Sequence, residues 1–240
     1  MRPYTITITG SSNSGKTLFT KTLLNTLHED YDVKNCIVID WDFEKATLTH
    51  DLLNYNLPDG VYSHIIDNKP LSIINTHSNV NLVPPGIVDD ERVLLKLNNH
   101  YQIVSRLDDL FSKNLRRYDF VINDLSVAPY LPISRYVMFK SDIIIYIIDT
   151  LNYRTDIVSK YVNFLTSRVE PSPHILLVYN KVIDKKVRSE FTIPYIPNLP
   201  IKLRRGKVDK EVVKTVRKVK SKILELIFQS PLPVERRVRL

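Results

Sequence analysis

The chain has 240 residues, of which 43% are hydrophobic and 25% are charged, the balance of a globular protein with one substantial core. Its single cysteine, Cys36, excludes an internal disulfide framework and fits a reducing cytoplasm, and no apolar stretch reaches membrane-spanning length. The motifs G-x-S-x-G and C-x-x-C do not occur, so hydrolase triads and zinc sites have no support. We therefore expect one cytoplasmic domain spanning residues 1–240, with Cys36 as a buried packing residue.

The positive charge is concentrated at the C-terminus. The formal net charge at pH 7 is +8, and residues 201–240 alone carry 13 Lys and Arg against 4 Asp and Glu. Residues 1–200 carry 21 basic and 22 acidic side chains, so the whole basic excess belongs to the last 40 residues. Such an asymmetry favours an anionic partner for the C-terminal region.

Short apolar runs alternate with helical patterns along most of the chain. The runs predict strands over Tyr4–Thr9, Cys36–Ile39, Val80–Val83, Phe120–Ile122, Ile143–Ile148 and Ile175–Tyr179. Apolar residues at helical spacing predict helices over Lys16–Leu27, Asp89–Ser112, Arg154–Ser167 and, roughly, Lys210–Phe228. The alternation predicts an α/β protein, in which helices cover both faces of a mostly parallel central sheet. The continuous run Ile143–Ile148 is typical of a strand buried on both faces.

The first predicted strand runs directly into a glycine-containing loop, and a helix follows the loop. Residues Gly10–Thr17 read G-S-S-N-S-G-K-T and fit the phosphate-binding pattern G-x-x-x-x-G-K-[ST]. Successive N–H groups of such a loop bind phosphate at the helix N-terminus, while Lys16 reaches the β- and γ-phosphates and Thr17 ligates Mg²⁺. The predicted nucleotide contacts in this segment are Gly10, Ser11, Ser12, Asn13, Ser14, Gly15, Lys16, Thr17 and Leu18.

Two predicted strands end in aspartate. One runs into Asp40-Trp41-Asp42 and the other into Asn123-Asp124. At the carboxyl ends of parallel strands these carboxylates would face the crevice where the phosphate loop lies. Asp124 is placed to hold the Mg²⁺ shell, directly or through water. Asp40 and Asp42 alternate in facing, so we expect only one of them to point directly at the nucleotide.

Two further patterns mark the ends of later strands. Asp149 also ends a strand, and we expect it to be structural because no other motif accompanies it. Asn180-Lys181 is followed by Ile183 at the position where guanine-specific proteins have an aspartate, and the nearest aspartate is Asp184. The guanine clamp is therefore out of register, which favours adenine.

Pro194, Pro197 and Pro200 recur at three-residue spacing. Proline interrupts helices and central strands, so we expect residues 194–203 to form an extended loop without a helix. Because ligands bind at the carboxyl ends of parallel strands, this loop is a candidate wall of the site.

In this order, the motifs resemble those of the ParA/MinD family of P-loop ATPases, a part of the SIMIBI class. The segment I-V-I-D-W-D (37–42) is similar to the family's strand ending in D-x-D, and Y-D-F-V-I-N-D (118–124) is similar to its Walker B strand. Three further strands of the family resemble V-N-L-V-P-P-G (80–86), S-D-I-I-I-Y-I-I-D-T (141–150) and L-L-V-Y-N-K-V (176–182). The resemblance covers about residues 3–225.

The resemblance implies a three-layer P-loop NTPase fold and a Mg²⁺-dependent ATPase. Members of the family mostly dimerise around nucleotide and act on DNA or membranes. The roles it assigns are phosphate and Mg²⁺ binding to Lys16 and Thr17, orientation of the attacking water to Asp40, support of the metal shell to Asp42 and Asp124, and adenine contact to Asn180 with the loop near Pro197.

The phosphate loop departs from the family at one charged position. The family's loop reads G-K-G-G-x-G-K-T, and its first lysine reaches across the dimer to the partner's phosphates. Here Ser11 stands at that position, and a hydroxyl cannot supply the charge. Three alternatives follow: a weaker face-to-face homodimer, another cation that substitutes, or a different way of working.

The C-terminal region combines basic charge with an apolar stripe. Ten basic residues lie between Lys202 and Lys222, and the stripe runs from Val212 to Ile227 at helical spacing. A docked helix of this kind would present its charges to DNA phosphates without sequence specificity. The residues expected to bind DNA are Lys202, Arg204, Arg205, Lys207, Lys214, Arg217 and Lys218. An inert solvated face and a membrane-surface helix are the alternatives.

Together these features predict a cytoplasmic ATPase of DNA partition or positioning, with a stimulating partner protein as a further expectation. A membrane-associated positioning ATPase is one alternative. A metabolic ligase of the same fold, similar to dethiobiotin synthetase, is another, because such enzymes also lack the signature lysine.

Overall fold

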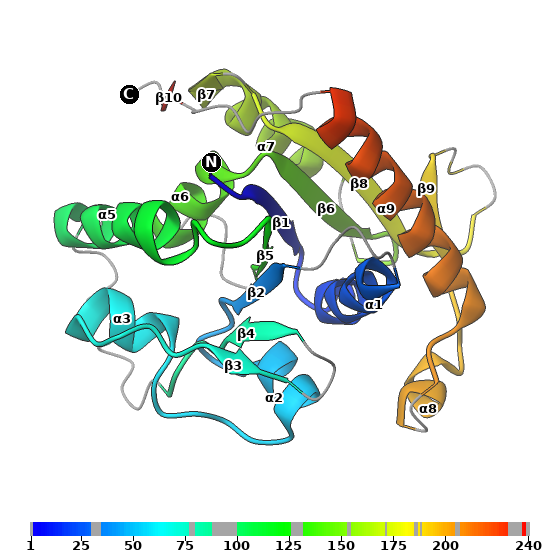
Figure 1. Cartoon of the computed structure of the whole chain (residues 1–240). Helices are drawn as coiled ribbons and strands as arrows, with labels where there is room; N and C mark the ends of the chain where they lie inside the picture. The colour runs from blue at the N-terminus through cyan, green and yellow to red at the C-terminus, as the bar shows by residue number, and fades with distance from the viewer. Residues whose placement is uncertain are drawn as a thin grey trace.

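The computed structural model describes residues 2–29, 35–76, 80–87, 100–125, 132–152, 155–170, 172–184, 187, 189–204, 207–229 and 237–238. Within these residues one eight-stranded sheet is formed by β1 (Tyr4–Gly10), β2 (Cys36–Asp40), β3 (Ile74–Asn75), β4 (Asn81–Val83), β5 (Phe120–Asp124), β6 (Ile143–Asp149), β8 (His174–Val182) and β9 (Phe191–Pro194). The strand order is β3-β4-β2-β5-β1-β6-β8-β9, and only the pair of β3 and β4 is antiparallel (Figure 1).

Helices pack on the sheet along most of its width (Figure 1). The described helices are α1 (Lys16–His28), α2 (Thr47–Leu53), α3 (Val61–Asp67), α5 (His100–Asp109) with a π-helical turn (Leu110–Asn114), α6 (Pro132–Lys140), α7 (Thr155–Arg168), α8 (Leu199–Arg204) and α9 (Lys210–Gln229). A separate two-stranded ladder joins β7 (Val169–Glu170) to β10 (Arg237–Val238).

The buried side chains form cores on opposite faces of the sheet. On one face Ile6 of β1 belongs to a cluster with Phe19 of α1 and Val216 of α9. On the other face Ile39 of β2 belongs to a cluster with Leu107 of α5 and with side chains of α3 and α6. Successive strand residues point to opposite faces, so β2 and β5 contribute apolar side chains to both clusters, whereas β1 contributes only to the first because its other face carries Thr5, Thr7 and Thr9. The predicted α/β fold, a mostly parallel sheet between two helical layers, is confirmed.

Strand β6, which contains the predicted run Ile143–Ile148, is buried along its entire length, as its composition indicated. Cys36 is buried as expected, and burial raises the pKa of its thiol to about 12, which makes it inert.

Most predicted elements are confirmed, with small shifts at their ends. Helices α1 and α9 agree with prediction to within one residue at each end. Strands β2, β5 and β6 each extend to the aspartate that follows the predicted run, so Asp40, Asp124 and Asp149 are the last residues of their strands. Of the helix predicted over Asp89–Ser112, residues 89–99 lie outside the described part of the chain, as does Arg154 of the helix now observed as α7.

The prediction of an extended loop over residues 194–203 is wrong. Pro194 ends strand β9, and residues from Leu199 to Arg204 form helix α8. Pro200 is the second residue of that helix, where the missing N–H would have no intrahelical partner in any case. The strand β9 lies at the edge of the sheet, which is where proline is tolerated.

Several short elements were not predicted at all. Helices α2 and α3 have seven residues each, too few to establish a helical period, and β3 has two. Their boundaries therefore depend on tertiary packing more than on local pattern.

Helix α9 packs beside α1 rather than standing free (Figure 1). Its buried residues include two polar ones that the apolar stripe did not indicate: Thr215, whose hydroxyl donates to the Thr192 carbonyl at 2.7 Å, and Lys220. The Lys220 ammonium donates to the Thr26 carbonyl at 3.0 Å, in the last turn of α1, where a cation favours the helix dipole. Helix α9 is thus an integral part of the core. In the part of the chain that the structure describes, no helix is long and apolar enough to cross a membrane.

A pair of matched isoleucine substitutions tests this docking. Ile223 of α9 is 0% exposed, whereas Ile201 of α8 is 54% exposed. We expect Ile223→Ala to lower the free energy of unfolding by about 2–5 kcal/mol, because it leaves a cavity between α9 and the sheet. Ile201→Ala should change it by less than about 0.5 kcal/mol. Urea denaturation followed by circular dichroism measures both, and equal effects would show that α9 is not docked in solution.

Candidate functional site

Five strands end at the same edge of the sheet, and residues at or near their ends build the site. They are β1, β2, β5, β6 and β8, which bring Gly10, Asp40, Asp124, Asp149 and Asn180 to this edge. Asp40 lies beside Asp124 in the ladder, and Asp149 lies beside Asn180. The carboxyl edge of a parallel sheet is where ligands bind in such folds.

The loop from β1 to α1 has a backbone that only small or flexible residues adopt. Gly10, Asn13 and Gly15 have φ angles of 150°, 57° and 91°. A Cβ atom on Gly10 would lie 2.2 Å from the Ile147 carbonyl oxygen, and one on Gly15 would lie 2.7 Å from the Asn180 amide nitrogen. Both glycines of the motif are therefore required by close contact as well as by conformation.

The end of β8 braces this loop from the side. The Asn180 amide donates to the Ser14 carbonyl at 2.7 Å, and the Lys181 ammonium donates to the Asn13 carbonyl at 3.0 Å. Lys181 also forms an ion pair with Asp149 at 2.6 Å. Burial by itself would raise the pKa of the Asp149 carboxyl, but hydrogen bonds from Lys181, Asn152 and the Leu151 N–H, together with the Lys181 charge, outweigh it and hold that pKa below its usual value. Asp149 thus has a structural role, as the sequence indicated.

The brace also bears on the adenine contact predicted for Asn180. Its amide oxygen accepts from the Lys181 N–H at 2.8 Å while its amide nitrogen contacts Ser14. The role that the geometry displays is support of the phosphate loop, and the adenine contact stays a prediction. The sequence analysis did not predict that Lys181 supports the phosphate loop, although it noted the Asn180-Lys181 pair at the end of this strand.

Lys16 lies across the loop and is almost fully buried. Its ammonium donates to the Ser11 carbonyl at 2.7 Å and to the Gly10 carbonyl at 3.3 Å. Burial lowers the pKa of this ammonium, and the nearby carboxylates of Asp124 and Asp42 partly offset the effect. The lysine is therefore held at the mouth of the loop, between the carbonyls and two carboxylates.

Asp124 is a fully buried carboxylate at the end of β5. Neither of its oxygens has a hydrogen-bond partner within the described residues, although the Thr17 and Thr20 hydroxyls lie near enough to lower its pKa somewhat. Burial, followed by the charge of neighbouring Asp40, raises the pKa of Asp124 to about 7. An unsatisfied buried carboxylate beside the Thr17 hydroxyl fits a divalent cation, which would supply the missing positive charge.

Asp40 is fully buried, and both of its carboxylate oxygens accept hydrogen bonds. One carboxylate oxygen accepts from the Asp42 N–H at 3.0 Å, and the other accepts from both the N–H and the hydroxyl of Thr49 at 2.8 Å. Burial raises the pKa of Asp40 to about 6, against the effect of these hydrogen bonds. Its carboxylate links β2 to α2 and is not among the groups that line the phosphate pocket, and the water-orienting role stays a prediction.

The phosphate pocket has a volume of about 330 Å³ and lies between the phosphate loop and the segment from β2 to α2. It is lined by Ser12, Asn13, Ser14, Gly15, Lys16, Thr17, Leu18, Asp42, Glu44, Lys45 and Thr47. Of the two aspartates in the D-W-D segment, Asp42 lines this pocket and Asp40 does not. Residues two apart on a strand share a face, so the difference arises because Asp42 lies beyond the end of β2. Sequence reasoning did not single out Lys45 or Thr47.

A polar network beneath the pocket positions the residue between the two aspartates. The Trp41 indole N–H donates to the Asn123 amide oxygen at 2.9 Å, and the Asn123 amide donates to the Thr7 hydroxyl at 3.2 Å. Thr7 shares a further hydrogen bond of 2.6 Å with the Ser141 hydroxyl. All four side chains are buried, so the network fixes the exit of β2 relative to β1 and β5.

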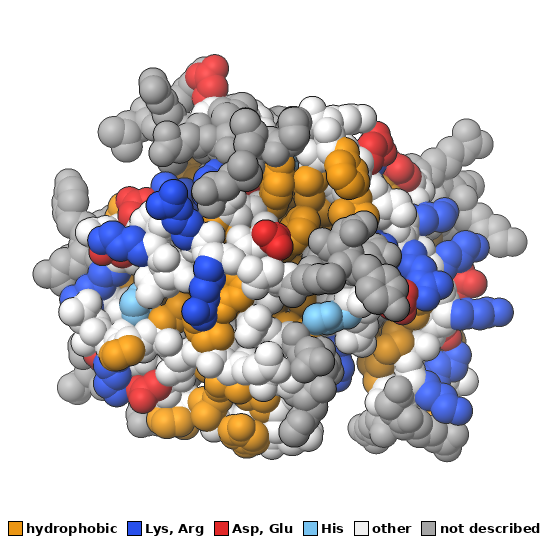
Figure 2. Space-filling view, in the orientation of Figure 1, with side chains coloured by type: hydrophobic (Ala, Val, Ile, Leu, Met, Phe, Trp, Pro, Cys, Tyr) orange, Lys and Arg blue, Asp and Glu red, His pale blue; other side chains and the backbone are white. Residues whose placement is uncertain are grey.

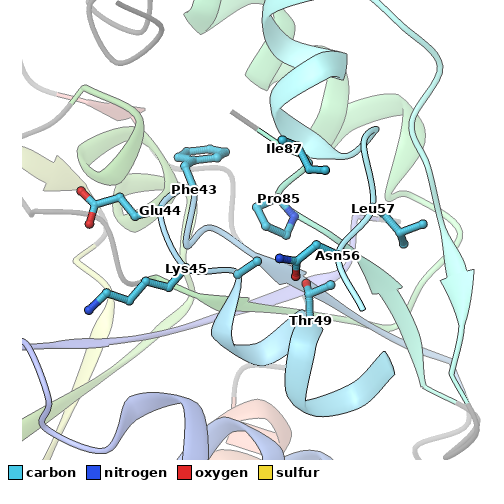
Figure 3. Close-up of a pocket in the computed structure, with 10 residues that line it drawn as sticks. Phe43, Glu44, Lys45, Thr49, Asn56, Leu57, Pro85 and Ile87 are labelled. Carbon is cyan, nitrogen blue, oxygen red and sulfur yellow. The ribbon is translucent and has the colours of Figure 1, made fainter. Parts of the chain in front are cut away.

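A second, smaller cavity of about 110 Å³ adjoins the phosphate pocket and shares Glu44 and Lys45 with it (Figure 3). Its remaining lining comes from Phe43, Ala46, Thr49, Asn56, Leu57, Pro85, Gly86 and Ile87. The segment that follows β4 is held against the start of α3, since a Cβ on Gly60 would lie 2.2 Å from the Pro84 carbonyl oxygen.

Pro197, predicted beside the adenine, is exposed and lines neither cavity.

Basic side chains gather on the side of the molecule formed by α8 and α9 (Figure 2). Lys207, Lys214 and Lys218 are exposed. Lys202 and Arg217 are also exposed, but they form ion pairs with Asp209 and Glu29. Two of the predicted DNA contacts, the side chain of Arg204 and the whole of Arg205, lie outside the described residues.

Comparison with protein-family models found no match, and no curated protein is significantly similar in sequence. Solved structures do match. The chain is similar to cobyrinic acid a,c-diamide synthase from Mycobacterium smegmatis, determined with an ATP analogue and magnesium, with 14% identity, a TM-score of 0.70, and coverage of 97% of this chain and 98% of that one.

Two ATPases are comparably similar in structure. The cell division ATPase MinD from Pyrococcus furiosus matches with 20% identity and a TM-score of 0.67 over 91% of this chain and 98% of that one. A ParA family ATPase from Chlorobium tepidum matches with 11% identity and a TM-score of 0.69 over 90% and 96%. The chain therefore has the three-layer P-loop fold of the MinD and ParA ATPases, as the sequence motifs implied.

Proposed function

We propose that this protein binds ATP with Mg²⁺ in the phosphate pocket, hydrolyses it, and acts on DNA in partition or positioning through its basic C-terminal helix. The single observation that carries the proposal is the buried, unsatisfied carboxylate of Asp124 beside a complete phosphate loop. Leaving such a group unpaired costs about 1–3 kcal/mol, a cost typical of sites built to bind a ligand.

Nucleotide binding is also supported by two buried hydroxyl groups of the phosphate loop. The hydroxyls of Ser11 and Ser14 are buried and lack hydrogen-bond partners in the described part of the chain. They lie in a loop whose N–H groups precede the N-terminus of the 13-residue helix α1, where anions bind favourably. The displaced guanine motif at Asn180 favours ATP over GTP.

The residues present also fit Mg²⁺. This ion keeps several waters and phosphate oxygens as ligands, so it needs only one or two protein groups, which Thr17 and Asp124 would supply. Mg²⁺ would neutralise charge that develops on the phosphates during hydrolysis. The raised pKa of Asp124, about 7, means that its proton must leave before it can serve the cation.

For hydrolysis, Asp42 is better placed than Asp40 to orient the attacking water. Its carboxylate accepts from the Lys45 N–H at 3.1 Å and from the Thr47 hydroxyl at 2.9 Å, which hold it at the wall of the phosphate pocket. A carboxylate held in this way can accept a hydrogen bond from water without reorganising.

DNA binding is supported by the exposed face of α9. Lys214 and Lys218 lie four residues apart on a helix whose opposite face is buried, so their charges point outward together. Neither forms an ion pair within the described residues, which leaves both available to phosphates. The likeness to a ParA family ATPase is compatible with this use, with a nucleotide-dependent homodimer, and with a partner protein that stimulates hydrolysis.

A second candidate function is ATP-dependent ligation of a small molecule. It is favoured by the 110 Å³ cavity that adjoins the phosphate pocket, where an acceptor would lie next to the terminal phosphate. The similar synthase from Mycobacterium smegmatis fits this alternative. ATP turnover in the absence of any small molecule, and raised by duplex DNA, would favour partition over ligation.

Substitution of Lys16 tests nucleotide binding. We expect Lys16→Ala to weaken ATP binding roughly 100-fold, because it removes a charged donor to phosphate. Lys21→Ala changes a partly exposed lysine further along α1, which pairs with Asp51 and lines neither cavity, and should leave the affinity unchanged. Isothermal titration with Mg·ATP measures both, and unchanged affinity in Lys16→Ala would refute the phosphate-loop assignment.

Substitution of the two aspartates in the D-W-D segment, Asp40 and Asp42, separates catalysis from folding. We expect Asp42→Asn to lower ATP turnover roughly 100-fold or more while ATP affinity changes less than about threefold. Asp40→Asn should chiefly lower thermal stability, because an amide nitrogen would face the N–H and hydroxyl donors of Thr49. Steady-state phosphate release and thermal melts provide the readouts. Loss of turnover in Asp40→Asn at unchanged melting temperature would return the water-orienting role to Asp40.

Paired charge reversals test DNA binding. We expect Lys214→Glu with Lys218→Glu to weaken binding to duplex DNA about tenfold or more at 0.1 M salt, and to reduce the slope of log affinity against log salt by about 2. The control is Lys113→Glu with Arg116→Glu, which changes the net charge equally on exposed residues remote from α9. Fluorescence anisotropy compares the variants, and equal losses would mean that only net charge matters.

A further inference from the structure

The wall of the phosphate pocket opposite the phosphate loop carries a lysine that no motif indicated. Lys45 lines the pocket together with Asp42, Glu44 and Thr47, all from the segment between β2 and α2. Lys16 and Lys45 are the only Lys or Arg among the described residues that line it. A triphosphate in this pocket would therefore meet one cation from each wall.

The backbone at Lys45 is fixed, although its side chain is exposed. Its N–H donates to the Asp42 carboxylate at 3.1 Å, and the N–H of the next residue, Ala46, donates to the Asp42 carbonyl at 2.9 Å. The Thr47 hydroxyl donates to the same carboxylate at 2.9 Å. The side chain therefore starts from a defined point, and less freedom is lost when its ammonium contacts a ligand.

The Lys45 ammonium is also available. It has no hydrogen bond or ion pair with any residue that the structure describes. The two other lysines near the loop are engaged, Lys16 with loop carbonyls and Lys181 with Asp149 and Asn13. In Figure 3 the Lys45 side chain extends away from Thr49 and Asn56 of the smaller cavity, which leaves it free to serve the phosphate pocket.

Its position relates it to the end of the nucleotide that Lys16 contacts. Asp42 is close enough to Lys16 to affect the ammonium of that lysine, and the backbone of Lys45 is hydrogen-bonded to the same Asp42 carboxylate. Carboxylates surround this region, so a terminal phosphate needs more positive charge than Lys16 alone provides. Ser11, uncharged and with a buried hydroxyl, cannot provide it.

We propose that Lys45 supplies, from within the same chain, the second protein cation that contacts the terminal phosphate of bound ATP. Nucleotide binding by one copy is then complete without a lysine from a second copy. The proposal rests on the proposed ATP binding and names a residue that sets the preference for triphosphate over diphosphate.

The first experiment compares two nucleotides. We expect Lys45→Ala to weaken binding of Mg·AMPPNP about tenfold and binding of Mg·ADP less than threefold, because only the former carries the terminal phosphate. Lys45→Arg should bind AMPPNP within about threefold of the unchanged protein, since the charge is kept. Lys113→Ala is the matched exposed-lysine control. Equal affinities of Lys45→Ala and the unchanged protein for AMPPNP would overturn the proposal.

A mixing experiment distinguishes action within one chain from action across a dimer. Excess Lys16→Ala protein, which retains Lys45, is added to Lys45→Ala protein during AMPPNP titration. No recovery of affinity supports action within one chain, and recovery would show that Lys45 acts on a partner's nucleotide. Failure of the proposed ATP binding itself is a separate outcome. In that case the Lys16→Ala variant and the unchanged protein would show the same response to AMPPNP.

Discussion

The close approach of the phosphate loop to β6 and β8 is the constraint on which the site depends. A single Cβ atom at Gly10 or Gly15 would fall within 2.7 Å of the Ile147 carbonyl or the Asn180 amide. The loop is therefore shaped by the sheet as much as by its own sequence. Lys181 and Asn180 add hydrogen bonds to the same loop, so its N–H groups are held ready before any ligand arrives.

Two neighbouring buried carboxylates then divide the work at the edge of the sheet. Asp40 is satisfied by donors from Asp42 and Thr49 and joins β2 to α2. Both oxygens of Asp124 lack a hydrogen-bond partner within the part of the chain that the structure describes, and its raised pKa reflects burial beside another acid. One carboxylate stabilises the loop that carries Asp42 and Lys45, while the other stays open to a cation. Stability and ligand binding are thus assigned to adjacent side chains of the same type.

Much of the fold was predictable because its signals are local. The continuous apolar run Ile143–Ile148 indicated β6, the glycine loop indicated the β1–α1 junction, and the apolar stripe indicated α9 to within one residue. The prolines at 194–200 misled, since the tolerance of Pro200 depends on its place in the first turn of α8. Short helices such as α2 and α3 carried too little period to be recognised.

The sequence by itself determined the phosphate loop, the parallel sheet and the aspartates at its carboxyl edge, because each depends on residue type and order along one segment. Only the tertiary structure decided which aspartate faces the pocket, because the hydrogen bonds of Asp40 come from Thr49, nine residues away on another element. The same holds for Lys45 and Lys181. Lys45 lies across the phosphate pocket from the loop, and Lys181 contacts Asn13 and Asp149. Tertiary packing sets the distances between these separate segments.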